Sequence, residues 1–103
     1  MLNEQPAYLV GNFTVTDPLL MAEYGKQAAP LVQKHGGKII LSTHTLAPEE
    51  GNAEPVLVII QFPDEESARA FYYSQEYAPL KQLRIKATKG GFLALTSGLP
   101  ATI

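Results

Sequence analysis

The chain has 103 residues, of which 46% are hydrophobic and 17% charged, and its formal net charge is −2. This length fits one core, so we expect a single domain over residues 1–103. The small negative charge gives no reason to expect nucleic acid or an anionic membrane as a partner. The absence of cysteine excludes disulfides, thiolate catalysis and cysteine-ligated metal centres.

The N-terminal sequence MLNEQPAYLV lacks the basic start and the long apolar stretch of a signal peptide. The longest aliphatic run, from Val56 to Ile60, is far shorter than a membrane-spanning helix. We therefore expect a cytoplasmic protein with no membrane partner.

Residues 7–15 are rich in β-forming side chains and predict a first strand. A helix is expected over residues 18–35, because Asp17 can cap its N-terminus, Pro18 fits its first turn and Gly36-Gly37 can end it. Pro30 lies inside this helix and is expected to bend or split it. The expected buried stripe, at three- and four-residue spacing, consists of Leu20, Tyr24, Ala28, Leu31 and His35.

Residues 38–45 predict a second strand, and residues 55–62 predict a third that is apolar enough for the middle of a sheet. Asp64 can begin a second helix, which we expect to jog and restart at Ser74, a second capping residue. Gly90-Gly91 is expected to end that helix before a fourth strand over residues 92–97. The lead-in at residues 1–6 and the tail from Gly98 lie at the margins of a core over about 7–98, and the tail is expected to be ordered only if a partner holds it.

This βαββαβ order is typical of an α+β, ferredoxin-like fold with a four-stranded antiparallel sheet. Right-handed crossovers place the third strand between the first and second, with the fourth on the other side of the first. The helices then cover one face of the sheet, and they cannot cover all of Val10, Ile39, Leu41, Leu57 and Ile59. Because soluble monomers rarely expose a large apolar patch, we expect a second copy of the chain to cover the other face.

Catalytic signatures such as GxSxG, GxxxxGK[ST] and GxGxxG do not occur in the chain. His44 lies near the end of the predicted second strand, beside the loop that carries Glu49, Glu50 and Glu54, and a histidine with carboxylates can bind a metal or move a proton. The spacing of these residues does not match a zinc site. We predict neither a metal nor a cofactor.

Asn12 and Gln61 are amides expected among aliphatic residues on the sheet face away from the helices. Burying each amide costs about 1–3 kcal/mol unless it finds hydrogen-bond partners. In one interpretation they pair with each other, with the backbone or with water inside a dimer. In the other they line a small-molecule cavity.

Residues 71–77, FYYSQEY, hold four of the nine aromatic residues of the chain. Phe71 is expected in the core, whereas Tyr72 and Tyr77 could serve both the core and the rim of a cavity. Arg84 shares a helical stripe with Tyr77 and is expected to be half-buried. A guanidinium there needs a carboxylate, carbonyls or an anionic ligand, and a structural pair with a glutamate or a helix C-terminus is the simplest expectation.

The segments AYLVGNFTVTDP, KHGGK, Phe62-Pro63, SARAFYYSQEY, LRIKATKGG and TSG follow one another in an order and spacing that match a known family. Over about residues 7–98 the chain resembles the domain of unknown function 1330 family, within the dimeric α/β-barrel (ferredoxin-like) superfamily. The resemblance implies a homodimer whose two sheets pack face to face as a barrel. It also implies that no activity is established for the family as a whole.

The resemblance places recurrent family residues at Tyr24, Gly36, Gly37, Phe62, Ser74, Tyr77 and Arg84. Tyr72 stands where relatives often have tryptophan or tyrosine. Gln61 stands where relatives commonly have glutamate, and an amide there cannot act as a general base. The second-strand segment IILSTHT also lacks an arginine often seen in relatives, which weakens an anion-binding role.

Three functions therefore stay open. The chain could form a homodimeric barrel that binds a small organic molecule between the sheet and the helices. It could instead be a cofactor-independent enzyme like the monooxygenases or lactone isomerases of the superfamily, or a non-catalytic accessory protein with a filled barrel. The candidate ligand-binding residues are Asn12, Tyr24, His44, Gln61, Tyr72, Tyr77 and Arg84.

Overall fold

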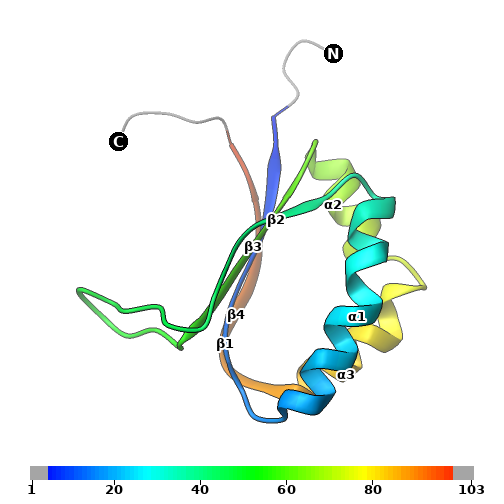
Figure 1. The fold of residues 1–103 in the computed structure, drawn as a ribbon. Coiled ribbons are helices and arrows are strands. Elements are labelled where there is room, and N and C mark those ends of the chain that lie inside the picture. Colours follow the sequence, from blue (N-terminus) through cyan, green and yellow to red (C-terminus); the bar gives the residue numbers. More distant parts are fainter. Residues whose placement is uncertain (1–4, 99–103) are drawn as a thin grey trace.

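The computed structural model describes residues 5–98, so most of the predicted lead-in and tail lies outside the described residues. Its elements are β1 (Ala7–Val15), α1 (Pro18–Lys34), β2 (Lys38–Thr43), β3 (Val56–Phe62), α2 (Glu65–Tyr72), α3 (Tyr77–Ala87) and β4 (Thr88–Ser97). The strands form one antiparallel sheet of order β2-β3-β1-β4, and the helices lie together on one of its faces (Figure 1). The predicted ferredoxin-like α+β fold and strand order are confirmed.

The helix α1 begins and ends at the predicted signals. The backbone amide of Leu20 donates to the carboxylate of Asp17 at 3.0 Å, and Gly36 adopts a left-handed φ of 79° just after the last turn. The helix continues without a break through Pro30, so the expected split is absent. Proline removes one backbone donor, and the neighbouring turns of this long helix maintain the conformation.

The jog between α2 and α3 forms at Ser74, as predicted. The hydroxyl of Ser74 donates to the carbonyl of Phe71 at 2.9 Å and accepts from the backbone amide of Tyr77 at 3.1 Å. These bonds close the last turn of α2 and satisfy a free donor of α3. Asp64 caps α2 by accepting from the amide of Ser67 at 2.7 Å.

The predicted role of Gly90-Gly91 is wrong. The helix α3 already ends at Ala87, and both glycines lie within β4 with positive φ values of 73° and 69°. They lie next to a shift in the β1–β4 register between Asn12 and Thr14. A Cβ atom on Gly91 would lie 1.8 Å from the carbonyl oxygen of Asn12, so the glycine permits two strands to approach closely at an irregularity.

The core lies between the sheet and the helices, although α1 packs mainly against α3 and stands off from the sheet. Ala28 and Leu31 of the predicted α1 stripe are buried, whereas Leu20, Tyr24 and His35 are partly exposed. The buried cluster consists of Ala7, Leu9, Ala28, Leu31, Val32, Phe62, Ala68, Phe71, Tyr77 and Leu80. The space between α1 and the sheet positions the candidate site.

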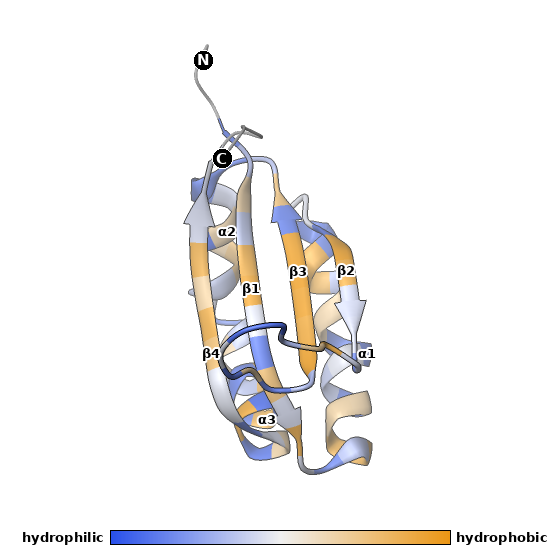
Figure 2. Ribbon diagram, turned by 90° about the vertical axis from the view of Figure 1, so that its left-hand side faces the viewer, coloured by the Kyte–Doolittle hydropathy of each residue, from blue (hydrophilic) through white to orange (hydrophobic). Residues whose placement is uncertain are grey.

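The other face of the sheet has no covering layer of helices, and hydrophobic residues run along its strands (Figure 2). Val10 pairs with Ile59, and Asn12 pairs with both Leu57 and Phe92, so these side chains share that face. Residues 44–55 form a loop that projects away from the helices (Figure 1). Within residues 5–98 no helix is long and apolar enough to cross a membrane.

Candidate ligand-binding site

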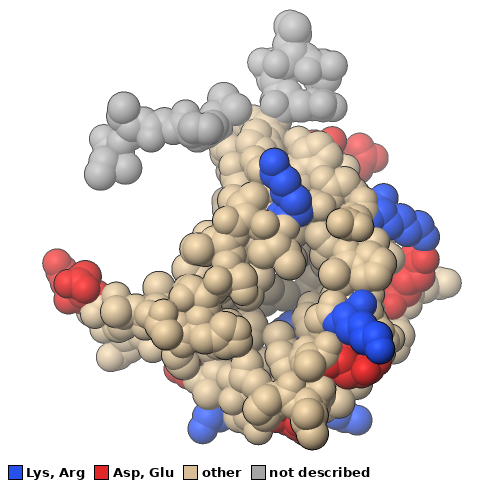
Figure 3. Space-filling view, viewed as in Figure 1, with Lys and Arg blue, Asp and Glu red and all other residues tan. Residues whose placement is uncertain are grey.

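A pocket of about 170 Å³ lies between α1 and the sheet. In the space-filling view it is visible as a hollow between these two layers (Figure 3). Gly25 and Ala29 of α1 and Ile39 and Ser42 of β2 line it and are exposed, so we place its mouth between α1 and β2. The lining residues are Leu9, Gly11, Phe13, Met21, Tyr24, Gly25, Ala28, Ala29, Val32, Ile39, Ser42, Val58, Ile60, Phe71, Tyr77, Arg84 and Leu93.

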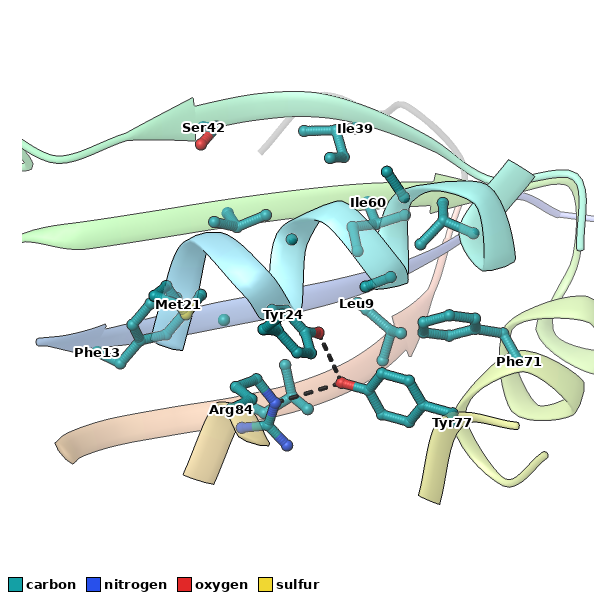
Figure 4. A pocket seen from close by; sticks show the side chains of 17 residues that line it. Leu9, Phe13, Met21, Tyr24, Ile39, Ser42, Ile60, Phe71, Tyr77 and Arg84 are labelled. Carbon is teal, nitrogen blue, oxygen red and sulfur yellow. Dashed lines mark hydrogen bonds between the residues drawn. The ribbon is translucent and has the colours of Figure 1, made fainter. Parts of the chain in front are cut away.

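Three polar side chains meet at the inner side of the pocket, opposite β2 (Figure 4). The hydroxyl oxygens of Tyr24 and Tyr77 lie 2.7 Å apart, and Nε of Arg84 donates to the Tyr77 hydroxyl at 3.3 Å. Tyr24 comes from α1, whereas Tyr77 and Arg84 lie seven residues apart on α3 and therefore on one side of that helix. The contact between α1 and α3 thus assembles the cluster.

The tyrosine rings are held in place by aromatic packing. Tyr77 is 2% exposed, and its ring centroid lies 4.6 Å from that of Phe71 and 6.3 Å from that of Tyr24. Aromatic pairs at these distances prefer tilted or edge-on arrangements, as observed here. The phenolic oxygens are therefore positioned on a well-packed base rather than on mobile side chains.

The environment keeps the phenol of Tyr24 neutral and the guanidinium of Arg84 charged. Burial raises the pKa of Tyr24 well above its usual value, and the neighbouring Tyr77 hydroxyl raises it further. Desolvation lowers the pKa of Arg84, but its hydrogen bond with Tyr77 and the neighbouring tyrosines outweigh this effect and the net shift is upward. The cluster consequently presents hydrogen-bond donors and a positive charge to the pocket.

Arg84 does not form the structural pair that is the simplest expectation from the sequence. The ion pairs of the described residues join Lys34 to Glu76 and Arg69 to Glu65, and neither involves Arg84. Its hydrogen-bond partner is the phenol of Tyr77 instead. The physical reason is that Arg84 points into the space beneath α1 (Figure 4), where no acidic side chain of the described residues lines the pocket.

Tyr72 lies close to this cluster but outside the pocket. Its ring centroid is 5.7 Å from that of Tyr77, and Nζ of Lys81 lies 4.2 Å from the Tyr72 ring centroid. Tyr72 lines a separate pocket beside β4, together with Arg69 and Tyr73. Its ring packs against that of Tyr77, and it does not line the pocket beneath α1.

The amides Asn12 and Gln61 lie on the opposite face of the sheet from the pocket. Nδ2 of Asn12 donates to the carbonyls of Glu54 and Val56, both at 2.9 Å, and its Oδ1 accepts from the amide of Glu54 at 3.0 Å. Gln61 makes one long bond of 3.4 Å to the hydroxyl of Tyr8. Asn12 thus holds the base of the 44–55 loop. For this residue, the structure agrees with the interpretation in which the amide pairs with the backbone.

His44 is exposed at the start of that loop and does not line the pocket. Across residues 5–98 no three histidine, aspartate or glutamate side chains are grouped so that they could hold a metal ion. Of the seven candidate residues, the structure therefore brings together Tyr24, Tyr77 and Arg84, and places Asn12, His44, Gln61 and Tyr72 elsewhere.

Sequence reasoning did not single out the apolar walls of the pocket. Met21, Tyr24, Gly25, Ala28 and Val32 lie on one face of α1 at three- and four-residue spacing, which is a readable helical pattern. The wall residues of β1 and β3 are alternate positions that face the helices, whereas Ile39 and Ser42 of β2 lie on either side of an irregularity in the β2–β3 register. What the pattern could not reveal is that these two surfaces stand apart instead of packing together.

The βαββαβ order, the single antiparallel sheet and the pocket under its helices define the class as a ferredoxin-like α+β protein. The sequence model described as Domain of unknown function (DUF1330) matches residues 6–97, and the chain belongs to this family. No match was found among proteins of curated function.

Solved structures with low sequence identity share this fold. A protein of unknown function from Rhodopseudomonas palustris has a TM-score of 0.75 at 15% identity, covering 96% of this chain and 86% of that one. SnoaB, a cofactor-independent oxygenase from Streptomyces nogalater, has a TM-score of 0.64 at 12% identity, covering 98% and 97%. A hypothetical protein from Arabidopsis thaliana also has a TM-score of 0.64 at 12% identity, covering 98% and 91%.

Proposed function

We propose that this protein is a homodimer that binds a small organic molecule in the pocket between α1 and the sheet. The observation that carries the proposal is the distribution of polarity in the pocket. Its walls are apolar, and apart from Ser42 at the mouth its polar side chains converge where Tyr24, Tyr77 and Arg84 meet. An apolar space with a few convergent polar groups is typical of small-molecule sites.

Gly25 supports the interpretation of this space as a binding site. It lies in the middle of α1 and lines the pocket, and a Cβ atom there would meet no heavy atom within 4 Å. A glycine inside a helix costs about 1 kcal/mol relative to alanine. The chain therefore carries a residue that weakens the helix at a position beside the pocket where alanine would fit without a clash.

The uncovered face of the sheet supports the homodimer. Phe92 is 54% exposed and Leu41 is 42% exposed on that face, beside the partly exposed Val10, Leu57 and Ile59. A second copy of the same face would bury these side chains with two-fold symmetry. Sedimentation at micromolar concentration tests this part: we expect a dimer, and a monomer would contradict it.

The alternative function is a cofactor-independent enzyme, as SnoaB is described to be. Its support is the donor cluster, because phenol and guanidinium groups can stabilise an oxyanion or enolate that forms during a reaction. No carboxylate or histidine of residues 5–98 lines the pocket, and the Tyr24 phenol holds its proton strongly. A substrate would therefore have to ionise without a side-chain base at this site.

The third interpretation, a non-catalytic accessory protein with no ligand, makes a different prediction from the other two. We would screen small ring compounds by thermal shift on the wild type and on Gly25→Leu, whose side chain would occupy the pocket. Binding in the pocket predicts shifts for the wild type that Gly25→Leu abolishes. Gly25→Ala is the matched control, because its smaller side chain leaves most of the space. Failure of every compound to shift the wild type would favour the accessory role.

A further inference from the structure

Arg84 brings a positive charge to the pocket without a carboxylate to balance it. Neither of the ion pairs found in residues 5–98 includes this guanidinium, whose Nε donates to the phenol oxygen of Tyr77. Arg84 is partly buried, and a charge that loses part of its contact with water is stabilised by an opposite charge nearby. No acidic side chain of the described residues lines the pocket, so a negative charge at this position would have to come from a ligand.

The hydrogen-bond balance of the cluster points the same way. Arg84 donates to Tyr77, and one phenolic proton is shared between Tyr77 and Tyr24. Because two phenols carry two protons, one hydroxyl hydrogen stays free of a partner within the cluster. The guanidinium also has donors on its two terminal nitrogens beyond the bond made by Nε. The cluster therefore has hydrogen-bond donors without partners and no negatively charged acceptor.

The size and walls of the pocket limit the rest of the ligand. An apolar cavity of roughly 150 Å³ takes up benzene, and this pocket measures about 170 Å³. The walls near the cluster include Leu9, Phe13 and Phe71, which are almost fully buried. One six-membered ring with a single small polar substituent fits these dimensions, whereas a multi-ring compound would extend through the mouth.

We propose that the ligand is a small ring compound with one anionic oxygen group, such as a carboxylate, which lies against Tyr24, Tyr77 and Arg84 while the ring fills the apolar space. This inference rests on the proposed binding function and adds the charge and size of the ligand. Charge-assisted hydrogen bonds from arginine and phenol hydroxyls would hold the anionic group, and the ring would be bound by burial.

Calorimetric titration with matched probes tests the inference. Benzoate and benzamide have nearly the same shape but differ in charge, and acetate carries the charge without the ring. We expect the wild type to bind benzoate about tenfold more tightly than benzamide, the factor that corresponds to one charge-assisted hydrogen bond. Acetate should bind much more weakly than either. Arg84→Met should reduce the benzoate preference to about onefold, and Arg84→Lys should restore part of it.

The outcomes separate the two proposals. If benzamide binds the wild type and is blocked by Gly25→Leu, but benzoate binds no better, the pocket is a binding site and the anionic ligand is wrong. A benzoate preference that persists in Arg84→Met would also overturn the inference, as would acetate binding as tightly as benzoate. If neither benzoate nor benzamide binds the wild type, the inference fails. Shifts by other ring compounds would then decide whether the proposed function survives.

Discussion

Asn12→Leu should destabilise the protein by about 2–4 kcal/mol, although a filled barrel would predict no loss or even a gain. The side chain of Asn12 is 5% exposed and makes hydrogen bonds to the backbone of Glu54 and Val56. Each such bond contributes about 1 kcal/mol net, and a buried polar group without a partner costs about 1–3 kcal/mol. Leucine would remove all of these bonds, and its added apolar burial would offset part of the loss.

Gln61→Leu is the matched control, because it makes the same amide-to-leucine change on the same face of the sheet. Gln61 is partly exposed and its described bond, to Tyr8, is 3.4 Å long. We expect a change within about 1 kcal/mol. Urea unfolding followed by far-UV circular dichroism measures both variants, and an unchanged m-value would confirm that the midpoints can be compared.

Hydrogen exchange at the amide of Glu54 shows where the loss occurs. This amide donates to Oδ1 of Asn12 at the base of the 44–55 loop. We expect faster exchange in Asn12→Leu, because the loop base detaches, and no change in Gln61→Leu. The reasoning would be refuted if Asn12→Leu were as stable as the wild type while the Glu54 amide kept its protection.

Three further predictions concern backbone freedom and ionisation. Gly25→Ala should raise the free energy of unfolding by about 1 kcal/mol, or the Tm by roughly 4–8 °C. At Gly51 an added Cβ would also meet no heavy atom within 4 Å, but the backbone has a φ of 79°. Gly51→Ala should therefore lower the free energy of unfolding by about 1–2 kcal/mol. Gly91→Ala should prevent normal β1–β4 pairing, because its Cβ would lie 1.8 Å from the carbonyl oxygen of Asn12. A variant with the circular dichroism spectrum and Tm of the wild type would contradict this prediction. The raised pKa of Tyr24 predicts that stability falls as pH rises above 10.0, since the unfolded chain then loses this proton first. Urea unfolding at rising pH should show a smaller fall in Tyr24→Phe.

The fold could be predicted because its signals are local. Asp17, Asp64 and Ser74 each make the capping bond that their positions indicate. The error at Gly90-Gly91 has a physical cause: a positive φ suits both the end of a helix and an irregular strand. The sequence does not distinguish the two, because the choice depends on β1 lying within van der Waals distance of Gly91.

The proximity of the candidate residues was predictable only for those that lie on one helix. Tyr77 and Arg84 share a stripe of α3, so their proximity follows from helical spacing. Asn12 and Gln61 are equivalent in sequence terms, yet only Asn12 has a close set of backbone partners, and these lie more than 40 residues away in the chain. Long-range partners and the space left beneath α1 arise from packing, which local patterns do not encode.

The two parts of the proposed function use opposite faces of one sheet and should be separable. The mouth of the pocket lies between α1 and β2 on the helix side, whereas Phe92 lies on the uncovered face beside Asn12. Because Phe92 is 54% exposed, Phe92→Lys should leave the folded monomer intact while placing like charges at a two-fold interface. We expect sedimentation to show a monomer and titration to show ring-compound affinity within about twofold of the wild type.

Leu19→Lys is the control for that experiment, because Leu19 is an exposed hydrophobic residue on α1, away from the sheet face. It should leave both the dimer and the ligand affinity unchanged. Loss of ring-compound binding in the Phe92→Lys monomer would mean that the partner copy contributes to the pocket, and the site would then belong to the dimer. Retained dimerisation would instead show that the uncovered face is not the interface. The first result would contradict the separation of pocket and interface by the sheet, and the second would contradict the choice of interface.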